Sequence, residues 1–477
     1  MIGAIAAGHP LTAEAGARVL EAGGSAVDAC VGAAFVSWVC ESPLTGPGGG
    51  GFMLVHEGRG ARTQVLDFFA AVPRGVAAGA LLELAVDFGG TQQLFRTGEA
   101  AVGVPGMVLG LEAAHRRWGR VPWRELVEPA ARLARDGFEV TPATAYLHQI
   151  LDGLLRHSPE GDAMYGVEGR SARAGERLAF TEFASTLEKI AERGASVIYT
   201  GECARAIVEH VQGGGGALRL QDLADYRLIR RRPVSVSYRG HEFRSNPPPS
   251  SGGLLVGVGL RALGDADATP SAIVTAMEAQ ETVRDGAFAR ALYRGGLAKR
   301  VLSGTTHISV IDGRGDAASL SASLGSGSGV VVPGTGIHLN NMLGELDLMG
   351  ASRPGERLTS MMAPSIVLHD GHARLVLGSA GSARLRGAIL QVIANVVAGD
   401  MSVKQAVEAP RVHAECGVVH CEDPAAADAL ESEGREVVRW RERNLYFGGV
   451  SAVEVLSDGA LGAAGDPRRG GASVVVA

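Results

Sequence analysis

The chain has 477 residues, of which 46% are hydrophobic and 20% charged, and its formal net charge is −6. This composition is typical of a globular protein and excludes an intrinsically disordered chain. The slight excess of acidic residues argues against a nucleic-acid partner, whose phosphates call for a clear surplus of Lys and Arg.

Two helices are predicted at the start of the chain, at residues 12–22 and 25–40, on either side of a Gly-Gly pair. Thr12 and Ser25 stand where helix N-caps are expected. Small residues in the second helix predict that it packs closely against another element. A glycine-rich segment at 46–51 and a strand at 52–56 follow.

The middle of the chain is predicted to be mainly helical, and the part after residue 304 rich in strands. Apolar residues recur at spacings of three and four in 106–118, 123–136 and 202–212, whereas 230–244 has the pattern of a strand. Strands are expected at 307–312, 317–324, 365–369, 374–377, 450–456 and 472–476, and helices at 382–398 and 403–408. This alternation of strands and long helices indicates an α/β or α+β layered fold.

Neither a metal site nor a membrane span is expected. The chain has five cysteines, and Cys416 and Cys421 lack a second pair of ligands at a suitable spacing. The longest apolar stretch, residues 29–40, is well short of the roughly 18 to 20 residues that a spanning helix needs. The N-terminus has no signal-peptide pattern, so we expect a cytoplasmic protein. Separately, no cofactor is expected.

The glycines at 46–51 formally match the G-x-G-x-x-G dinucleotide-binding pattern. That motif follows a strand and precedes a helix, and here the order is reversed. A tight loop with a close backbone approach is the better interpretation.

The Gly304–Thr305 bond, just before a predicted strand, is the segment with the richest chemistry. Glycine tolerates the strain that lets a Thr hydroxyl attack its own preceding carbonyl, as N-terminal-nucleophile (Ntn) enzymes require. The α-amino group that this frees has a pKa of about 8 and can serve as the base for the hydroxyl. For His307, two residues on, a structural role is favoured because the amine already supplies that base.

Ten short motifs in chain order resemble the γ-glutamyltranspeptidase (glutathione hydrolase) family of Ntn hydrolases over nearly the whole chain. They are HPL with GGSAVDA (9–11 and 23–29), GGGGF (48–52), VPG (104–106), DLADY (222–226), PPSSGG (248–253), TTH (305–307), LNN (339–341), MMAP (361–364), APR (409–411) and DPRRG (466–470). Each is weak alone, but ten in order are specific.

The resemblance implies an α+β fold, a four-layer αββα sandwich made as a proenzyme that cuts itself between Gly304 and Thr305. Residues 1–304 would form the large subunit and residues 305–477 the small subunit, associated in a single domain. Thr305 is then the nucleophile of self-cleavage and turnover, and Ser323 carries the supporting hydroxyl.

The resemblance also assigns an oxyanion site and a carboxylate site. The backbone amides of Gly381 and Ser382 align with the oxyanion-binding pair, and a Ser in place of the family's second Gly is expected to cost little. Thr359 and Ser360 align with the Ser-Ser pair that holds the substrate's α-carboxylate. Arg468 and Arg469, at the end of the chain, are expected to tie down the C-terminal loop.

The glutamate site departs from the family pattern. Phe69 stands where an Arg grips the α-carboxylate, and Arg74 is the possible substitute nearby. Gly325 replaces an Asn, while Met342 and Glu345 replace the Gln and Asp that bind the α-amino group. Of these changes only Glu345 keeps the family chemistry, so a more apolar small-molecule substrate is predicted.

The sequence thus predicts a self-processing hydrolase or acyltransferase that forms an acyl-enzyme on Thr305, resolved by water or an amine. Two substrate classes stay open. One is a γ-glutamyl amide with relaxed recognition; the other is a remodelled acyl substrate, an amide or an activated C–C bond, in small-molecule biosynthesis, which the lost Arg favours. A relative that folds without processing and serves as a scaffold is the third alternative, and retention of Gly304, Thr305, Ser323 and Gly381 argues against it.

Overall fold

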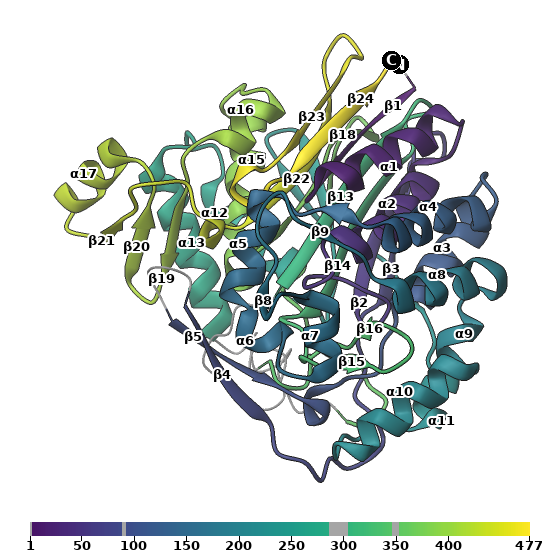
Figure 1. Cartoon of the computed structure of the whole chain (residues 1–477). Coiled ribbons are helices and arrows are strands. Elements are labelled where there is room, and N and C mark those ends of the chain that lie inside the picture. Colours follow the sequence, from purple (N-terminus) through teal and green to yellow (C-terminus); the bar gives the residue numbers. More distant parts are fainter. Residues whose placement is uncertain (1, 88–91, 286–303, 346–352) are drawn as a thin grey trace.

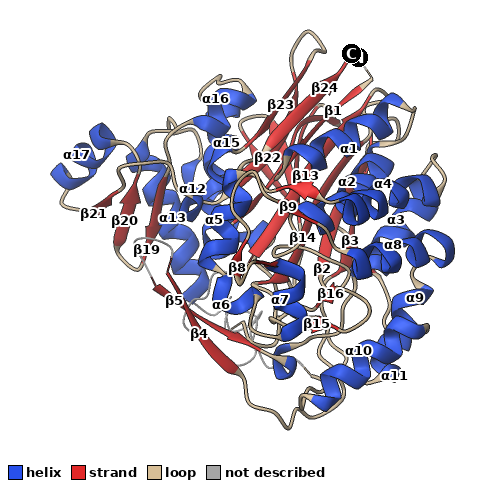
Figure 2. Ribbon diagram, in the orientation of Figure 1, coloured by secondary structure: helices blue, strands red, loops and turns tan. Residues whose placement is uncertain are grey.

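The computed structural model describes residues 2–87, 92–285, 304–345 and 353–477. Two antiparallel sheets lie at its centre, with helices around them, and the two ends of the chain lie side by side in the first sheet (Figures 1 and 2). Strands of the two sheets contact each other, and apolar side chains fill the interior between them. The combination of antiparallel sheets with packed helices makes the fold α+β.

The first sheet has seven strands in the order β10-β3-β2-β14-β13-β1-β24. Their bounds are β10 Ile229–Arg231, β3 Arg62–Phe68, β2 Gly50–Glu57, β14 Ala317–Gly325, β13 Gly304–Asp312, β1 Gly3–Ala7 and β24 Ala472–Val476. The second sheet, of six strands, has the order β11-β12-β17-β18-β22-β23. Its strands are β11 Val234–Tyr238, β12 His241–Ser245, β17 Ser365–His369, β18 His372–Ala380, β22 Gly449–Val455 and β23 Leu461–Gly465.

Different helices pack on each sheet. The first sheet contacts helices from the N-terminal part of the chain: α1 Pro10–Glu21, α2 Ala26–Cys40 and α3 Met107–Trp118, with α4 Trp123–Asp136 and α8 Thr181–Arg193 adjoining them. The second contacts α12 Gly252–Leu263, α15 Leu385–Val397 and α16 Val403–Glu408, with α13 Pro270–Asp285 packed on α12. Every residue of α2 is buried, which confirms that its small side chains permit close packing.

The remaining elements are short and lie outside the two central sheets. The helices are α5 Pro142–Ile150, α6 Asp152–Leu155, α7 Pro159–Tyr165, α9 Ser196–Tyr199, α10 Glu202–Gly213, α11 Leu220–Ala224 and α17 Pro424–Ser432. The strands are β4 Leu82–Asp87, β5 Gln92–Thr97, β6 Phe138–Glu139, β7 Gly166–Val167, β8 Arg170–Ser171, β9 Arg177–Leu178, β15 Val331–Val332, β16 Ile337–His338, β19 Val412–Glu415, β20 Val418–Cys421 and β21 Glu436–Arg439. Among the described helices, none is long and apolar enough to cross a membrane.

One predicted helix cap is confirmed and the other is wrong. Ser25 caps α2, and its hydroxyl and the Asp28 carboxylate accept each other's backbone N–H. The first helix begins at Pro10, where His9 Nδ1 accepts the N–H of Leu11, so Thr12 lies within the first turn. The Thr12 hydroxyl contacts a buried carboxylate of another element, an interaction that local patterning does not reveal.

The prediction of one strand over 230–244 is also wrong, because this segment contributes to three strands, one in the first sheet and two in the second. Ile229–Arg231 pairs with β3 in the first sheet, and Pro233, which has no N–H to donate, separates it from β11. Arg239 (φ 47°) and Gly240 (φ 76°) then form the tight turn between β11 and β12.

The predicted glycine loop is confirmed at residues 46–49, whereas Gly50 and Gly51 already belong to β2. A Cβ at Gly48 or Gly49 would collide with the backbone carbonyl of His338 or Ser323, so only glycine permits this approach. The loop therefore lies directly against the strand that carries Ser323.

Candidate active site

The Gly304–Thr305 bond lies at a break in the pairing of β13 with β14. Gly304 is opposite Gly325 and Thr306 is opposite Ala322, so two residues of β14, Ser323 and Leu324, face Thr305 alone. The N–H of Leu324 binds the carbonyl of Leu44, outside the ladder, at 2.9 Å. Such a bulge re-aims the side chains beside it, and here it turns Ser323 toward the bond.

The Ser323 hydroxyl donates a hydrogen bond to the carbonyl oxygen of Gly304. It also accepts the N–H of Gly325 at 2.8 Å, which fixes its direction. When the Gly304 carbonyl carbon is attacked, its oxygen gains negative charge, and a donor already aimed at that oxygen stabilises the charge. The geometry places Ser323 where a supporting hydroxyl is needed.

A cavity with about 330 Å³ of empty space opens beside Thr305. Seven of the residues predicted for the site line it: Phe69, Thr305, Ser323, Met342, Glu345, Ser360 and Ser382. Met361, Met362 and Leu385 complete the lining. Segments far apart in the sequence therefore meet at Thr305, as the motifs predicted.

Two of the predicted substrate-binding residues lie just outside this lining. Thr359 is buried next to Ser360, and its Oγ1 has no hydrogen-bond partner among the described residues. Gly325 has a φ of 76°, and a Cβ there would come 2.7 Å from Oε1 of Glu345. The buried Glu345 carboxyl thus lies against the backbone of β14, and the position has no room for the family's Asn.

The turn that carries the predicted oxyanion amides is strained. Gly381 has a φ of 123°, and a Cβ there would lie 2.8 Å from the Cα of Gly448. Ser382 has a φ of 55°, a left-handed conformation that costs a residue with a side chain about 1–2 kcal/mol. Ser at this position therefore costs backbone strain, while the backbone N–H proposed as the oxyanion donor is present with either residue. Residues 382–384 form a 3-10 turn, so the α-helix predicted from 382 begins at Leu385.

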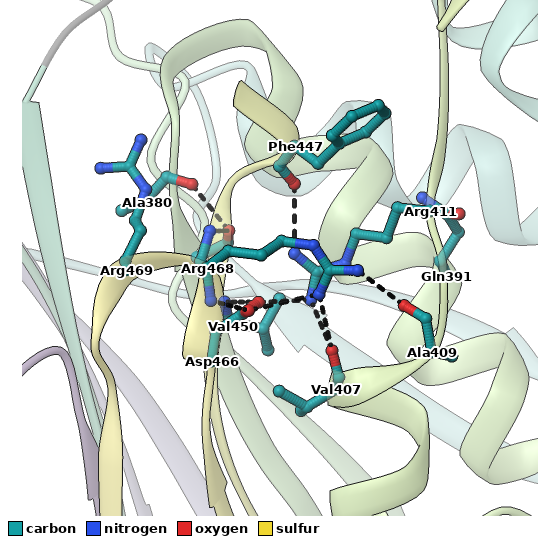
Figure 3. Close-up of polar contacts among 12 residues, drawn as sticks. Ala380, Gln391, Val407, Ala409, Arg411, Phe447, Val450, Asp466, Arg468 and Arg469 are labelled. Atoms are coloured by element: carbon teal, nitrogen blue, oxygen red, sulfur yellow. Dashed lines mark hydrogen bonds and ion pairs between the residues drawn. The ribbon is translucent and has the colours of Figure 1, made fainter. Parts of the chain in front are cut away.

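A buried ionic cluster supports the strand on which this turn rests (Figure 3). Asp466 is joined to Arg411 at 2.6 Å and to Arg468 at 3.3 Å, and its carboxylate accepts the N–H of Val450 at 3.0 Å. Burial alone raises the pKa of Asp466, but the two guanidiniums outweigh it and hold that pKa below its usual value. Val450 lies in β22, which pairs with β18 up to Ala380, the residue before the turn.

Arg468 and Arg469 tie down the C-terminal segment, as predicted. Arg468 forms an ion pair with Glu422 and donates to the carbonyl of Ala409 at 2.8 Å. Arg469 points away from the cluster and donates to the carbonyl of Leu445 at 3.3 Å. Burial lowers the pKa of Arg469 to about 10.

No basic side chain is among the described residues that line the cavity. Phe69 is buried and stacks on Phe52, with ring centroids 5.3 Å apart. Arg74 is not a substitute for the missing Arg, because its half-exposed guanidinium lies 3.2 Å from Asp225 and 3.6 Å from Asp222. The lining thus contains one carboxyl group, that of Glu345, and half of its residues are apolar.

His307 has contacts that indicate a structural role. Its ring nitrogens hydrogen-bond to Ser321 at 2.8 Å and to Ser309 at 3.0 Å. Burial lowers its pKa to about 3, so the imidazole is neutral near pH 7. No group of three or more His, Cys, Asp or Glu among the described residues is placed to hold a metal ion.

Glu41 is a candidate functional residue that none of the sequence motifs contains. This buried residue ends the apolar helix α2, and its carboxylate accepts hydrogen bonds from the hydroxyls of Thr12 and Thr306. A lone acidic residue directly after fifteen buried helical positions was the signal that could have revealed it.

Comparison with known proteins agrees with this geometry. The family model "Gamma-glutamyltranspeptidase" matches residues 12–284 and 265–476. The Acylase ACY 1 proenzyme of Pseudomonas sp. (strain SE83) is 33% identical over 526 residues, covering 99% of this chain and 93% of the relative. The glutathione hydrolase proenzyme of Escherichia coli (strain K12) is 30% identical over 532 residues, covering 98% and 90%. The crystal structure of cephalosporin acylase from Bacillus halodurans superposes with a TM-score of 0.82 at 25% identity, covering 99% of this chain and 95% of that one.

Proposed function

The chain belongs to the gamma-glutamyltranspeptidase family, and on that premise we propose that it cuts its own Gly304–Thr305 bond and then transfers apolar acyl groups through Thr305. It is a self-processing hydrolase or acyltransferase, like its proenzyme relatives.

Self-cleavage begins with attack of the Thr305 hydroxyl on the Gly304 carbonyl carbon. Ser323 donates to the carbonyl oxygen as negative charge develops there. Collapse of the adduct breaks the C–N bond, so the hydroxyl proton ends on the departing nitrogen, the α-amino group of Thr305 is freed, and an ester joins Gly304 to the Thr305 oxygen. Water then hydrolyses the ester, which releases the Gly304 carboxylate and restores the Thr305 hydroxyl.

Cleavage would leave a large subunit, residues 1–304, and a small subunit, residues 305–477, that share both sheets. In the first sheet β1 and β2 of the large subunit pair with β13 and β14 of the small one. In the second, β12 pairs with β17. These shared ladders, with α2 packed on the first sheet and α15 on the second, support a four-layer αββα sandwich formed by two associated chains.

In turnover, Thr305 attacks the carbonyl carbon of a small-molecule substrate while its α-amino group takes the hydroxyl proton. The backbone amides of Gly381 and Ser382 are proposed to bind the oxyanion. Water or an amine then resolves the acyl-enzyme.

The composition of the cavity lining carries the proposal about specificity. A carboxylate that entered this cavity would lose its water without meeting a guanidinium, and it would face the carboxyl group of Glu345. Phe69, Met342 and Met362 instead offer apolar contacts. We therefore infer an acyl group without an α-carboxylate, cut from an amide. The similarity to proteins named acylases supports this inference.

Denaturing mass spectrometry of the wild-type protein beside Thr305→Ala tests the proposed cleavage. The wild type should give chains of 304 and 173 residues (477 − 304 = 173). Thr305→Ala should remain whole, and Ser309→Ala, on the same strand, should still be cut. A wild-type protein that stays a single chain would favour the scaffold alternative.

A further inference from the structure

The carboxylate of Glu41 lies where helices α1 and α2 meet the start of β13. Glu41 follows the last residue of α2, donating its N–H to the Ser37 carbonyl at 2.8 Å. Its own carbonyl accepts the N–H groups of Leu44 at 2.8 Å and Thr45 at 3.2 Å. The backbone of Glu41 is therefore fixed by the end of α2 and by the turn that follows.

Each carboxylate oxygen of Glu41 accepts a threonine hydroxyl. Thr12 of α1 donates to Oε1 at 2.7 Å, and Thr306 of β13 donates to Oε2. An ionised carboxylate only accepts hydrogen bonds, so it matches two hydroxyl donors. Burial raises the pKa of Glu41 above its usual value, and the hydrogen bonds from Thr306 and Thr12 offset only part of that rise. Thr306 is thus anchored through a buried carboxyl group to two helices.

Thr305 itself is not fixed by close packing alone. It lines the acyl cavity on one side and a second cavity, with about 290 Å³ of empty space, that Glu41 and Thr306 also line. The strand pairing is shifted at this position, so the regular ladder does not set its direction either. A Cβ at Gly8 would lie 2.8 Å from Oγ1 of Thr306, so the Glu41–Thr306 pair lies against bare backbone.

We propose that Glu41 is a positioning residue for self-cleavage, which holds Thr306 and thereby directs the neighbouring Thr305 hydroxyl at the Gly304 carbonyl. Thr306 is bonded directly to Thr305, so fixing the side chain of Thr306 restrains the backbone from which the Thr305 side chain projects. The inference rests on the proposed self-cleavage and adds to it a residue outside the acyl cavity.

The test compares four variants in a time course of cleavage after cell-free synthesis, read on a denaturing gel. Glu41→Gln keeps the shape but exchanges an acceptor for a donor, and Thr306→Val removes the hydroxyl. Each should slow cleavage about tenfold or more, because the buried hydrogen bond that holds Thr306 is lost. Thr306→Ser keeps the hydroxyl and should restore a rate near that of the wild type. Thr12→Val is the matched control, because it removes the other donor to the same carboxylate away from β13, and it should cleave faster than Thr306→Val.

Folding is checked separately by combining each variant with Thr305→Ala and measuring its thermal midpoint against Thr305→Ala alone. Cleavage of Glu41→Gln and Thr306→Val at the wild-type rate would overturn the inference. If Thr306→Ser and Thr12→Val slowed cleavage as much as Thr306→Val does, the inference would be overturned as well, because that pattern indicates a general loss of packing. If the wild type itself stays whole, the proposed self-cleavage fails instead.

Discussion

The reaction centre and the acyl cavity share Thr305 but are built differently. At the centre, polar groups are held by backbone: Ser323 bridges Gly304 and Gly325 at the bulge of two paired strands. Apolar side chains, among them Met342 and Phe69, make up half of the residues that line the cavity. We therefore expect the paired strands to determine the chemistry and the cavity side chains to determine the substrate specificity. The specificity can then change while the chemistry is retained.

This contrast predicts that the centre is sensitive to single substitutions, including those in the ionic cluster around Asp466 that supports it. Arg411→Ala leaves the Asp466 carboxylate with one of its two ionic partners in a buried site and should lower the free energy of unfolding by about 3–5 kcal/mol. Urea unfolding on a Thr305→Ala background, which keeps one chain, measures this. The exposed Arg441→Ala is the control and should change little. An unchanged midpoint for Arg411→Ala would show that the cluster does not support the centre.

The same cluster sets an acid limit on stability. The pKa of Asp466 is lower in the folded chain than its ordinary value of 3.8. Its contribution to stability is therefore fully present above about pH 4 and is lost as the pH falls through the lower, folded-state pKa. Arg411→Ala should weaken this acid dependence, and unfolding curves between pH 5 and pH 2 would show it.

Ser323→Ala should have the next largest effect. It removes a donor aimed at the developing oxyanion, so self-cleavage should slow by about 10²–10³-fold. Ser321→Ala, two residues earlier on β14 and bonded to His307, should cleave much faster than Ser323→Ala. Equal rates for the two variants would remove Ser323 from the reaction centre.

Ser382→Gly should have the smallest effect and act in the opposite direction. Glycine adopts the left-handed backbone of this turn without strain, so stability should rise by about 1 kcal/mol. Because the proposed oxyanion donor is the backbone N–H, turnover should be preserved. Loss of turnover with the fold intact would mean that the Ser382 side chain takes part in the reaction.

The sequence was most informative where a local pattern dictates the outcome. Ser25 is predictable as a cap from its position directly before the helix, Thr305 lies in one of the ordered motifs, and Ser323 is assigned through the family resemblance. The hairpin within 230–244 was missed because the whole segment has a uniform strand pattern, although its parts belong to two different sheets. Glu41 and the left-handed Ser382 depend on contacts between distant segments, which no local pattern contains.

We propose that an intact acylation centre is joined to a cavity that lacks the Arg with which the family grips an α-carboxylate. The most direct test is kcat/KM of the processed enzyme for three p-nitroanilides: γ-glutamyl, 4-aminobutyryl, which lacks only the α-carboxylate, and butyryl, which lacks the amine as well. Both acyl groups without the carboxylate should exceed γ-glutamyl, by about tenfold or more, since a desolvated carboxylate finds no guanidinium here. Preference for γ-glutamyl over both would contradict the account.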